Sequence, residues 1–230
     1  MNRNFTAICA ALLMCAILIV FYGSVALGRS GVAFAECAEN KKVIYLTFDD
    51  GPSDRVTPKI LDVLKEENVK ATFFIVGKHA ETRKYLLRRE LEEGHTVAVH
   101  SYSHVYSDIY SSPENLIKDI DKCNEVISSA TGRVSPIYRF PGGSYGLSSS
   151  LIGAVNAHGM RYVDWNASTR DAELENPSVK EIFNSAVTTP ANKNNIVLLA
   201  HDSTTKTATA KALKDIIKYY KGLNYTFAAF

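Results

Sequence analysis

The sequence predicts an α/β domain in which parallel strands alternate with helices and curl into a barrel. About seven segments rich in strand-forming residues are separated, for the most part, by segments with helical periodicity. Parallel neighbours need crossover connections, and helices packed outside the sheet supply them. An open doubly wound sheet would show the same alternation. The first strand, however, runs into an Asp-Asp-Gly-Pro turn at 49–52 and not into a glycine-rich phosphate-binding turn, which favours the barrel.

The expected strands and helices follow one another in a regular order. The first strand is the apolar run 43–48, and a helix with one apolar face follows over about 57–67. Gly94 and Gly132 stand where helices are expected to end. Further strands are expected over 71–76, 96–99, 135–140, 161–165, 196–200 and 225–230, and further helices over about 80–93, 113–130, 148–158, 178–187 and 207–220.

The first 35 residues differ from the rest of the chain. No charged residue occurs from Phe5 to Leu27, so this segment predicts a hydrophobic targeting helix and not a helix of the domain core. Ala33 and Ala35 fit the cleavage site of a signal peptide. The length of the run favours an uncleaved membrane anchor, since spanning a bilayer takes about 20 apolar residues. Both interpretations place a domain at 36–230 outside the cytoplasm.

Composition excludes some classes of partner. The chain of 230 residues is 46% hydrophobic and 22% charged, which is ordinary for a single globular core. Its 26 Lys and Arg against 24 Asp and Glu leave a formal charge of +2, so no basic excess indicates a nucleic-acid partner. Cys37 and Cys123 belong to the domain, and their pairing stays open because a sequence does not give their distance.

Five polar clusters each follow directly on an expected strand. The carboxyl ends of the strands in a parallel barrel open on one face, and active sites are built there. Groups that are far apart in the sequence would therefore meet on one rim. The clusters are 47–52, 100–104, 139–143, 166–171 and 201–203.

The first two clusters contain residues that could bind a metal ion. His100 and His104 are four residues apart, so in a helical turn both rings face the same way. Two imidazoles and one carboxylate leave a coordination position open for water. Asp49 and Asp50 would point to opposite faces of a regular strand, but a bend at the Gly-Pro turn lets both reach the rim. Each motif alone has a plainer explanation, since Asp-Gly-Pro is a common turn.

Taken together and in this order, segments 47–52, 100–104, 139–143 and 199–202 resemble the successive motifs of the polysaccharide deacetylase family. This is the NodB-homology family, or carbohydrate esterase family 4. The resemblance covers about 42–230 and implies a distorted parallel (β/α) barrel. It also implies one divalent metal ion held by Asp50, His100 and His104. Zinc is the expected metal, and cobalt, nickel and manganese are the alternatives.

The resemblance implies roles for the remaining residues of these motifs. Asp49 is the expected catalytic base, and Arg139 pairs with it. His201 is the expected general acid. The backbone N–H of Gly142 is expected to donate to the oxyanion, and Leu199 is expected to line a small pocket for the acetyl group.

One motif departs from the family pattern. The fourth family motif usually reads Asp-x-x-Asp-Trp, and its first Asp tunes the acid histidine, whereas Ser168, Asp171 and Ala172 stand at these positions here. Asp171 is therefore the candidate for orienting His201. The absent tryptophan removes one wall of the substrate groove, so the resemblance does not imply a particular substrate.

The expected activity is metal-dependent removal of N-acetyl groups from the sugars of a polysaccharide. Peptidoglycan is the first candidate, because a domain outside a membrane meets the wall first, and chitin-like or xylan-type polymers are alternatives. An O-acetyl esterase would use the same ligands. A non-catalytic glycan-binding module is the remaining alternative, and it predicts the loss of reacting groups. The sequence nevertheless retains Asp49, Asp50, His100, His104 and His201.

Overall fold

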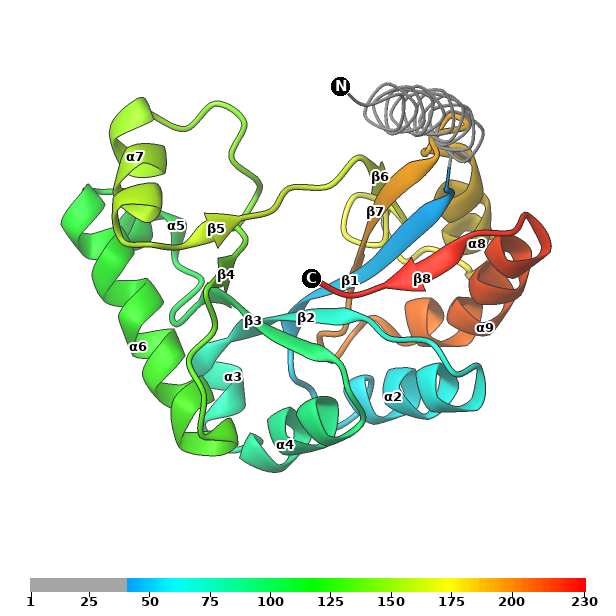
Figure 1. Cartoon of the computed structure of the whole chain (residues 1–230), viewed down its shortest axis with the longest axis horizontal. Coiled ribbons are helices and arrows are strands. Elements are labelled where there is room, and N and C mark those ends of the chain that lie inside the picture. The colour runs from blue at the N-terminus through cyan, green and yellow to red at the C-terminus, as the bar shows by residue number, and fades with distance from the viewer. Residues whose placement is uncertain (1–40) are drawn as a thin grey trace, which may run out of the picture. The chain divides into compact units, whose positions relative to one another are not determined.

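A computed structural model describes residues 41–230 of the chain, and its strands form one parallel sheet (Figure 1). The strand order is β5-β4-β3-β2-β1-β7-β6, and β8 pairs with β1 beside this path. The two outer strands of this order, β5 and β6, are not paired with each other, so the curled sheet forms an open barrel. This confirms the predicted fold class. The strands are β1 Val43–Gly51, β2 Thr72–Val76, β3 Thr96–Ser101, β4 Ile137–Tyr138, β5 Arg161–Tyr162, β6 Ala167–Ser168, β7 Asn195–His201 and β8 Thr226–Ala228.

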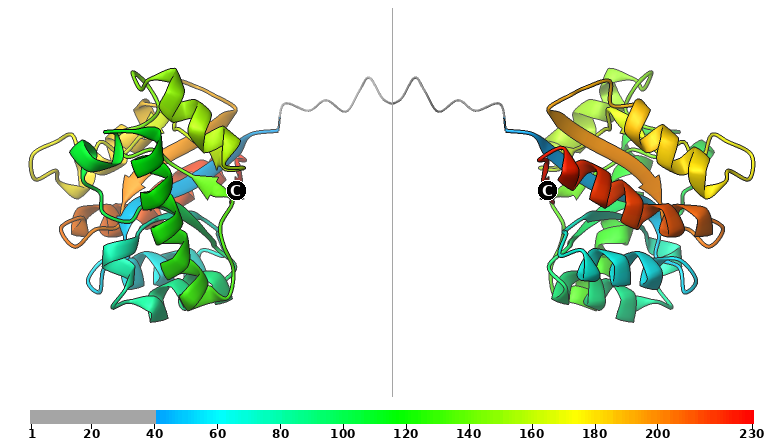
Figure 2. Two further views of the ribbon diagram at one scale, coloured as in Figure 1. Left: turned by 90° about the vertical axis from the view of Figure 1, so that its left-hand side faces the viewer. Right: turned by 90° about the vertical axis from the view of Figure 1, so that its right-hand side faces the viewer.

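The helices lie along the outside of the curved sheet. In side view, α6 and α7 cover one flank and α8 and α9 cover the other (Figure 2). Helix α6 shows how the sequence sets the ends of a helix: the Ser112 side chain accepts a hydrogen bond from the Asn115 N–H, and Gly132 ends the helix with φ of 74°. The helices are α2 Thr57–Glu66, α3 Gly77–Ala80, α4 Lys84–Glu92, α5 Tyr106–Ile109, α6 Pro113–Thr131, α7 Ser149–Ala157, α8 Val179–Thr188 and α9 Thr207–Gly222.

The sheet is buried on both faces, as expected for parallel strands. Along β1, Ile44, Leu46 and Phe48 face the helices and belong to the main hydrophobic core. Thr47 and Asp49 alternate with them, so they face the concave side of the sheet. A second, smaller core on that side consists of Phe74, Ala98 and Ile137. The concave face therefore combines a small apolar floor with the polar groups of the rim.

The expected elements differ from the structure in several places, and the strands expected over 135–140 and 161–165 are only two residues long. The helix expected over about 80–93 is α4, which begins only at Lys84 because Arg83 adopts the non-helical angles φ −126° and ψ 29°; the short helix α3 before it was not expected. Helix α5 and strand β6 were not expected. They have four and two residues, too few for a periodic hydrophobic pattern.

The predicted targeting helix, the boundary at 35/36 and Cys37 lie outside the described residues. Within 41–230, no helix is both long enough and apolar enough to cross a bilayer. Cys123 is buried on α6, where its Sγ donates a hydrogen bond to the Ile75 carbonyl at 3.3 Å.

Candidate active site

Two irregularities at the carboxyl ends of β1 and β3 shape the candidate site. The pairing of β1 with β2 skips Asp50, and the pairing of β3 with β2 skips His100. An extra residue of this kind bends a strand and redirects its side chains. Asp50 has φ of 70°, in the left-handed region. The neighbouring carboxylates of Asp49 and Asp50 therefore both reach the rim, although a regular strand would point them to opposite faces.

The two histidines come together by a different route from the predicted one. The helical turn expected between them is wrong. His100 belongs to β3, and His104 lies at the end of a tight turn, where its own φ is 56°. The Asp119 side chain of α6 holds this turn by accepting hydrogen bonds from the backbone N–H groups of Tyr102 and Ser103, at 2.7 and 2.9 Å. The imidazole rings of His100 and His104 lie 5.1 Å apart between centroids.

Asp50, His100 and His104 form a group that can hold a metal ion. One ligand atom from each lies within 4.8 Å of the other two. Asp50 Oδ1 is 3.2 Å from His104 Nε2 and 3.5 Å from His100 Nε2. Ligand atoms around a tetrahedral zinc ion are separated by about 3.3–3.5 Å, since each lies about 2.0–2.1 Å from the metal. Within residues 41–230, buried Asp50 Oδ1 has no hydrogen-bond partner of suitable geometry. The three residues therefore fit a divalent cation.

The protonation of His100 and Asp50 also suits metal binding. His100 Nδ1 lies 2.8 Å from the Arg139 carbonyl oxygen, which can only accept, so Nδ1 carries the hydrogen and Nε2 keeps its lone pair. Burial lowers the pKa of His100 and favours its neutral form. Burial alone would raise the pKa of Asp50. The close polar contact with the adjacent His104 and the surrounding histidines, including the positively charged His201, outweigh burial, so the pKa is lowered and Asp50 is ionised.

Arg139 fixes the second carboxylate of the pair. Its guanidinium is fully buried and donates at 2.8 Å both to Asp49 Oδ1 and to Thr47 Oγ1. Its Nε donates to the Val163 carbonyl at 2.9 Å, and its guanidinium lies 4.1 Å from the centroid of the Phe74 ring. Asp49 is therefore held on one oxygen, and its other oxygen, Oδ2, faces His100 Nε2 at 3.9 Å.

A histidine–carboxylate pair lies on the β7 side of the same cluster. His201 Nε2 is 4.0 Å from Asp50 Oδ2, and His201 Nδ1 is 2.7 Å from Asp171 Oδ1. Asp171 Oδ2 accepts from the His201 N–H at 2.9 Å and from Thr209 Oγ1 at 2.7 Å. Burial lowers the pKa of His201, but the hydrogen bond and charge of Asp171 more than offset burial and raise it to about 9. In the divergent fourth motif, the carboxylate beside His201 is thus Asp171.

The last two predicted site residues border this cluster. Gly142 has φ of 79°, and its N–H makes no hydrogen bond to the described residues, whereas the next N–H, of Gly143, donates to the Phe140 carbonyl. The Gly142 N–H is therefore free to donate to a substrate. Leu199 is buried on β7 two residues before His201, so both side chains project from the same face of the strand.

Two residues in this region did not emerge from the sequence. Tyr106 packs edge-on against the His104 ring, with 5.4 Å between centroids, and Thr209 holds Asp171. Tyr106 lies only two positions beyond the His-x-x-x-His pair, which was the available signal. Thr209 lies on an outer helix, and nothing in its local sequence indicates a contact with β7.

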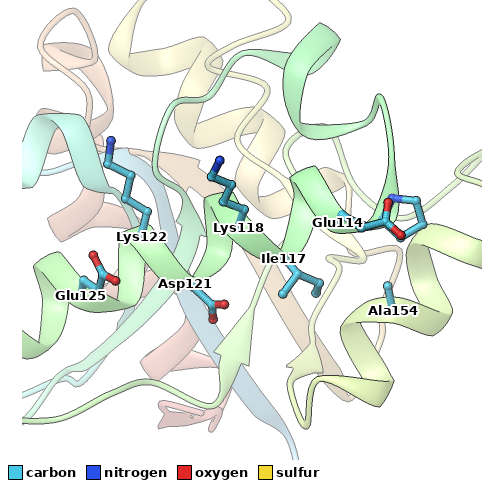
Figure 3. A pocket seen from close by; sticks show the side chains of 8 residues that line it. Glu114, Ile117, Lys118, Asp121, Lys122, Glu125 and Ala154 are labelled. Atoms are coloured by element: carbon cyan, nitrogen blue, oxygen red, sulfur yellow. The ribbon is translucent and has the colours of Figure 1, made fainter.

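Open depressions also lie on the surface away from this cluster. An open depression of about 740 Å³ runs along α6 and reaches Ala154 on α7. Lys118 and Lys122 extend to one side of α6, and Asp121 and Ile117 extend to the other (Figure 3). Its lining contains no histidine, and among the described residues the group that could hold a metal ion is at the rim and not here. The chemistry belongs to the rim of the barrel.

Together, the open parallel barrel and the groups at its strand ends define a metal-assisted hydrolase. A family model described as polysaccharide deacetylase matches residues 37–163. A peptidoglycan-N-acetylglucosamine deacetylase of Bacillus cereus is 31% identical over 86% of this chain and 91% of its own length. The chain therefore belongs to the polysaccharide deacetylase family.

Other relatives of known name agree with this assignment. A chitooligosaccharide deacetylase of Rhizobium leguminosarum is 39% identical over 75% of this chain and 77% of its own. The chain spans only 38% of the longer enzyme PgdA of Listeria monocytogenes, at 35% identity and with 83% of this chain covered. The catalytic domain of a peptidoglycan N-acetylglucosamine deacetylase from Eubacterium rectale superposes with a TM-score of 0.76 at 37% identity, covering 82% of this chain and 88% of that one.

Proposed function

We propose that this protein hydrolyses the N-acetyl groups of sugars in peptidoglycan, with the help of a divalent cation held by Asp50, His100 and His104. The observation that carries the proposal is that Asp49 and His201 both lie beside this group of ligands: Asp49 Oδ2 is 3.9 Å from His100 Nε2, and His201 Nε2 is 4.0 Å from Asp50 Oδ2. The names of the Bacillus cereus and Eubacterium rectale relatives support peptidoglycan as the polymer. The products are acetate and a free amine on the sugar.

The cation supplies Lewis-acid chemistry, which polarises a carbonyl and makes water a better nucleophile near neutral pH. Asp49 is proposed as the base that takes a proton from the attacking water. The Arg139 guanidinium supports this role because it holds Asp49 by Oδ1 and leaves Oδ2 beside His100 Nε2, one of the candidate ligand atoms. Positioned proton transfer of this kind contributes about 10²–10⁴-fold to a rate.

His201 is proposed as the acid that protonates the leaving amine. Its Nδ1 is occupied by Asp171, so the proton that it can donate is on Nε2, the nitrogen facing Asp50. The Gly142 N–H would stabilise the oxyanion, and one such donor contributes about 2.7–4 kcal/mol in other hydrolases. Leu199 would form the apolar wall of the acetyl pocket, because it lies on the strand face that carries His201.

Zinc is the proposed metal, since two neutral imidazoles and one carboxylate with an open position are the donor set of catalytic zinc sites. Cobalt, nickel and manganese accept the same donors and are the alternatives. We further propose that residues 1–35 are a signal peptide or membrane anchor with a short linker, and that the deacetylase domain, 36–230, works outside the cytoplasm. Fractionation of cells that express the whole chain, with an antibody to the domain, tests this location.

Acetate release tests the proposed reaction. The substrates are matched oligomers of peptidoglycan, chitin and O-acetylated xylan, assayed with and without a chelator. We expect release from the peptidoglycan oligomer that stops with chelator and returns when zinc is added. Release from acetylated xylan alone would instead make the protein an O-acetyl esterase. If the zinc-loaded protein binds the oligomers without releasing acetate from any of them, the proposal is wrong and a glycan-binding module remains.

A further inference from the structure

Gly142 leaves room for a tyrosine from a different part of the chain. A Cβ atom built on Gly142 would lie 3.2 Å from Cε1 and 3.3 Å from Oη of Tyr106. The Tyr106 ring therefore lies against the backbone of Gly142, whose N–H is the candidate oxyanion donor. A larger residue at position 142 would displace this ring, and φ of 79° adds strain for any residue with a side chain.

Contacts on both sides hold the Tyr106 ring in this place. It packs edge-on against His104 at 5.4 Å and against Tyr110 at 5.8 Å, measured between ring centroids. The Tyr110 hydroxyl donates to the Pro141 carbonyl at 2.7 Å, which ties the α5 segment to the loop that contains Gly142. Tyr106 thus bridges a metal-ligand candidate and the oxyanion-donor candidate.

The ring and hydroxyl of Tyr106 nevertheless remain available to a ligand. Tyr106 is 48% exposed, although it is a large aromatic residue in the middle of these contacts. Within 41–230, its hydroxyl makes no hydrogen bond, whereas the hydroxyls of neighbouring Tyr102 and Tyr110 both do. An exposed aromatic face beside a free hydroxyl suits a sugar ring, which has an apolar C–H face and a polar edge.

We infer that Tyr106 is a substrate-positioning residue: its ring forms the wall of the sugar site beside Gly142, and its hydroxyl hydrogen-bonds the N-acetylated sugar being hydrolysed. This inference rests on the proposed function and adds a determinant of substrate binding to it. The residue acts by placing the acetyl carbonyl at the Gly142 N–H, and it takes no part in proton transfer.

Two substitutions of Tyr106 separate the ring from the hydroxyl. The metal-loaded protein and its variants are assayed on an N-acetylglucosamine tetramer for kcat, KM, bound metal and Tm. We expect Tyr106→Ala to raise KM about tenfold or more, because it removes an aromatic anchor of the binding site. Tyr106→Phe keeps the ring, so its KM rises only about threefold, the effect of one hydrogen bond. Neither variant loses bound metal.

Tyr219→Ala is the matched control, because Tyr219 is also partly exposed, at 39%, but lies on α9 among Phe183 and Tyr220. Its KM should equal that of the unaltered protein. The inference is overturned if Tyr106→Ala also leaves KM unchanged, or if Tyr106→Phe is as impaired as Tyr106→Ala. It is equally overturned if Tyr106→Ala loses its metal, since Tyr106 would then only support His104.

The same variants are titrated with the tetramer by calorimetry, which distinguishes failure of the inference from failure of the proposed function. An unaltered protein that binds the tetramer but releases no acetate from it or from the peptidoglycan oligomer refutes deacetylation alone. Tyr106 is then judged by the loss of affinity in its two variants, and equal affinity of Tyr106→Ala and the unaltered protein would refute the inference.

Discussion

His100 and His201 both approach Asp50, yet their second ring nitrogens meet different groups. His100 Nδ1 meets the backbone carbonyl of Arg139 at 2.8 Å, whereas His201 Nδ1 meets the Asp171 carboxylate at 2.7 Å. A carbonyl orients a neutral imidazole without adding a full charge. A carboxylate orients the ring and also stabilises its positive form.

The difference in partner accounts for opposite pKa shifts in two histidines that are both largely buried. Burial lowers the pKa of each ring, and in His100 burial prevails. In His201 the hydrogen bond and charge of Asp171 prevail, and the pKa rises to about 9. At neutral pH, one histidine is therefore suited to bind a cation and the other to donate a proton. The group behind each ring therefore helps to separate the two roles.

The largest effect is expected from removing one of the three candidate metal ligands. His104→Ala removes one of three ligands, so bound metal is lost and acetate release falls to the level seen with chelator. His104 is preferable to His100 for this test because it is only half-buried, so the variant is more readily kept folded. Elemental analysis measures the metal. The control is His201→Ala, which keeps its metal but loses activity; metal content unchanged in His104→Ala would remove His104 from the ligand set.

A smaller effect is expected at Asp49, the proposed base, which lies beside both the candidate metal ligands and His201. Asp49→Asn keeps the shape and the hydrogen bond from Arg139 but cannot accept a proton from water. We expect bound metal to be unchanged and kcat to fall about 10²–10⁴-fold, the usual contribution of a positioned base. Turnover close to that of the unaltered protein, with metal in place, would contradict the assignment of Asp49 as the base.

The sequence predicted which groups would meet at the rim, because their positions depend on a simple regularity. Strand, polar cluster and helix alternate, so every cluster comes at a carboxyl end of the barrel. The contact between Asp50 and His104, which are far apart in the sequence, follows from this order alone. The same regularity gave most of the strands and most of the long helices.

The local geometry could not be predicted, because it depends on single backbone angles and on distant elements. The turn that brings His104 back toward His100 depends on φ of 56° and on Asp119, a residue of α6. The position of Tyr106 depends on the absence of a side chain at Gly142. A sequence pattern shows neither the angle nor the empty space. The likeness to a family supplied the roles, while the structure supplies the contacts on which they depend.

The smallest and most selective effect is expected at Asp171, the residue that makes His201 unlike His100. An acid must be protonated to work, so kcat/KM of the unaltered protein should fall as the pH rises through the pKa of His201. That pKa is raised from 6.5 to about 9, so activity is retained well above neutral pH. Asp171→Asn keeps a hydrogen-bond acceptor and removes the charge, so the pKa falls and the alkaline decline moves to lower pH.

Each pH unit by which the decline moves lowers the activity above both pKa values about tenfold. The pH dependence of kcat/KM measures the shift, and bound metal should be unchanged. Thr209→Val is the matched control: it removes a hydrogen bond to the same carboxylate but leaves its charge, so the decline should stay near its original pH. An unshifted decline in Asp171→Asn would show that the charge of Asp171 does not set the protonation of His201, and the contrast with His100 would then lose its physical basis.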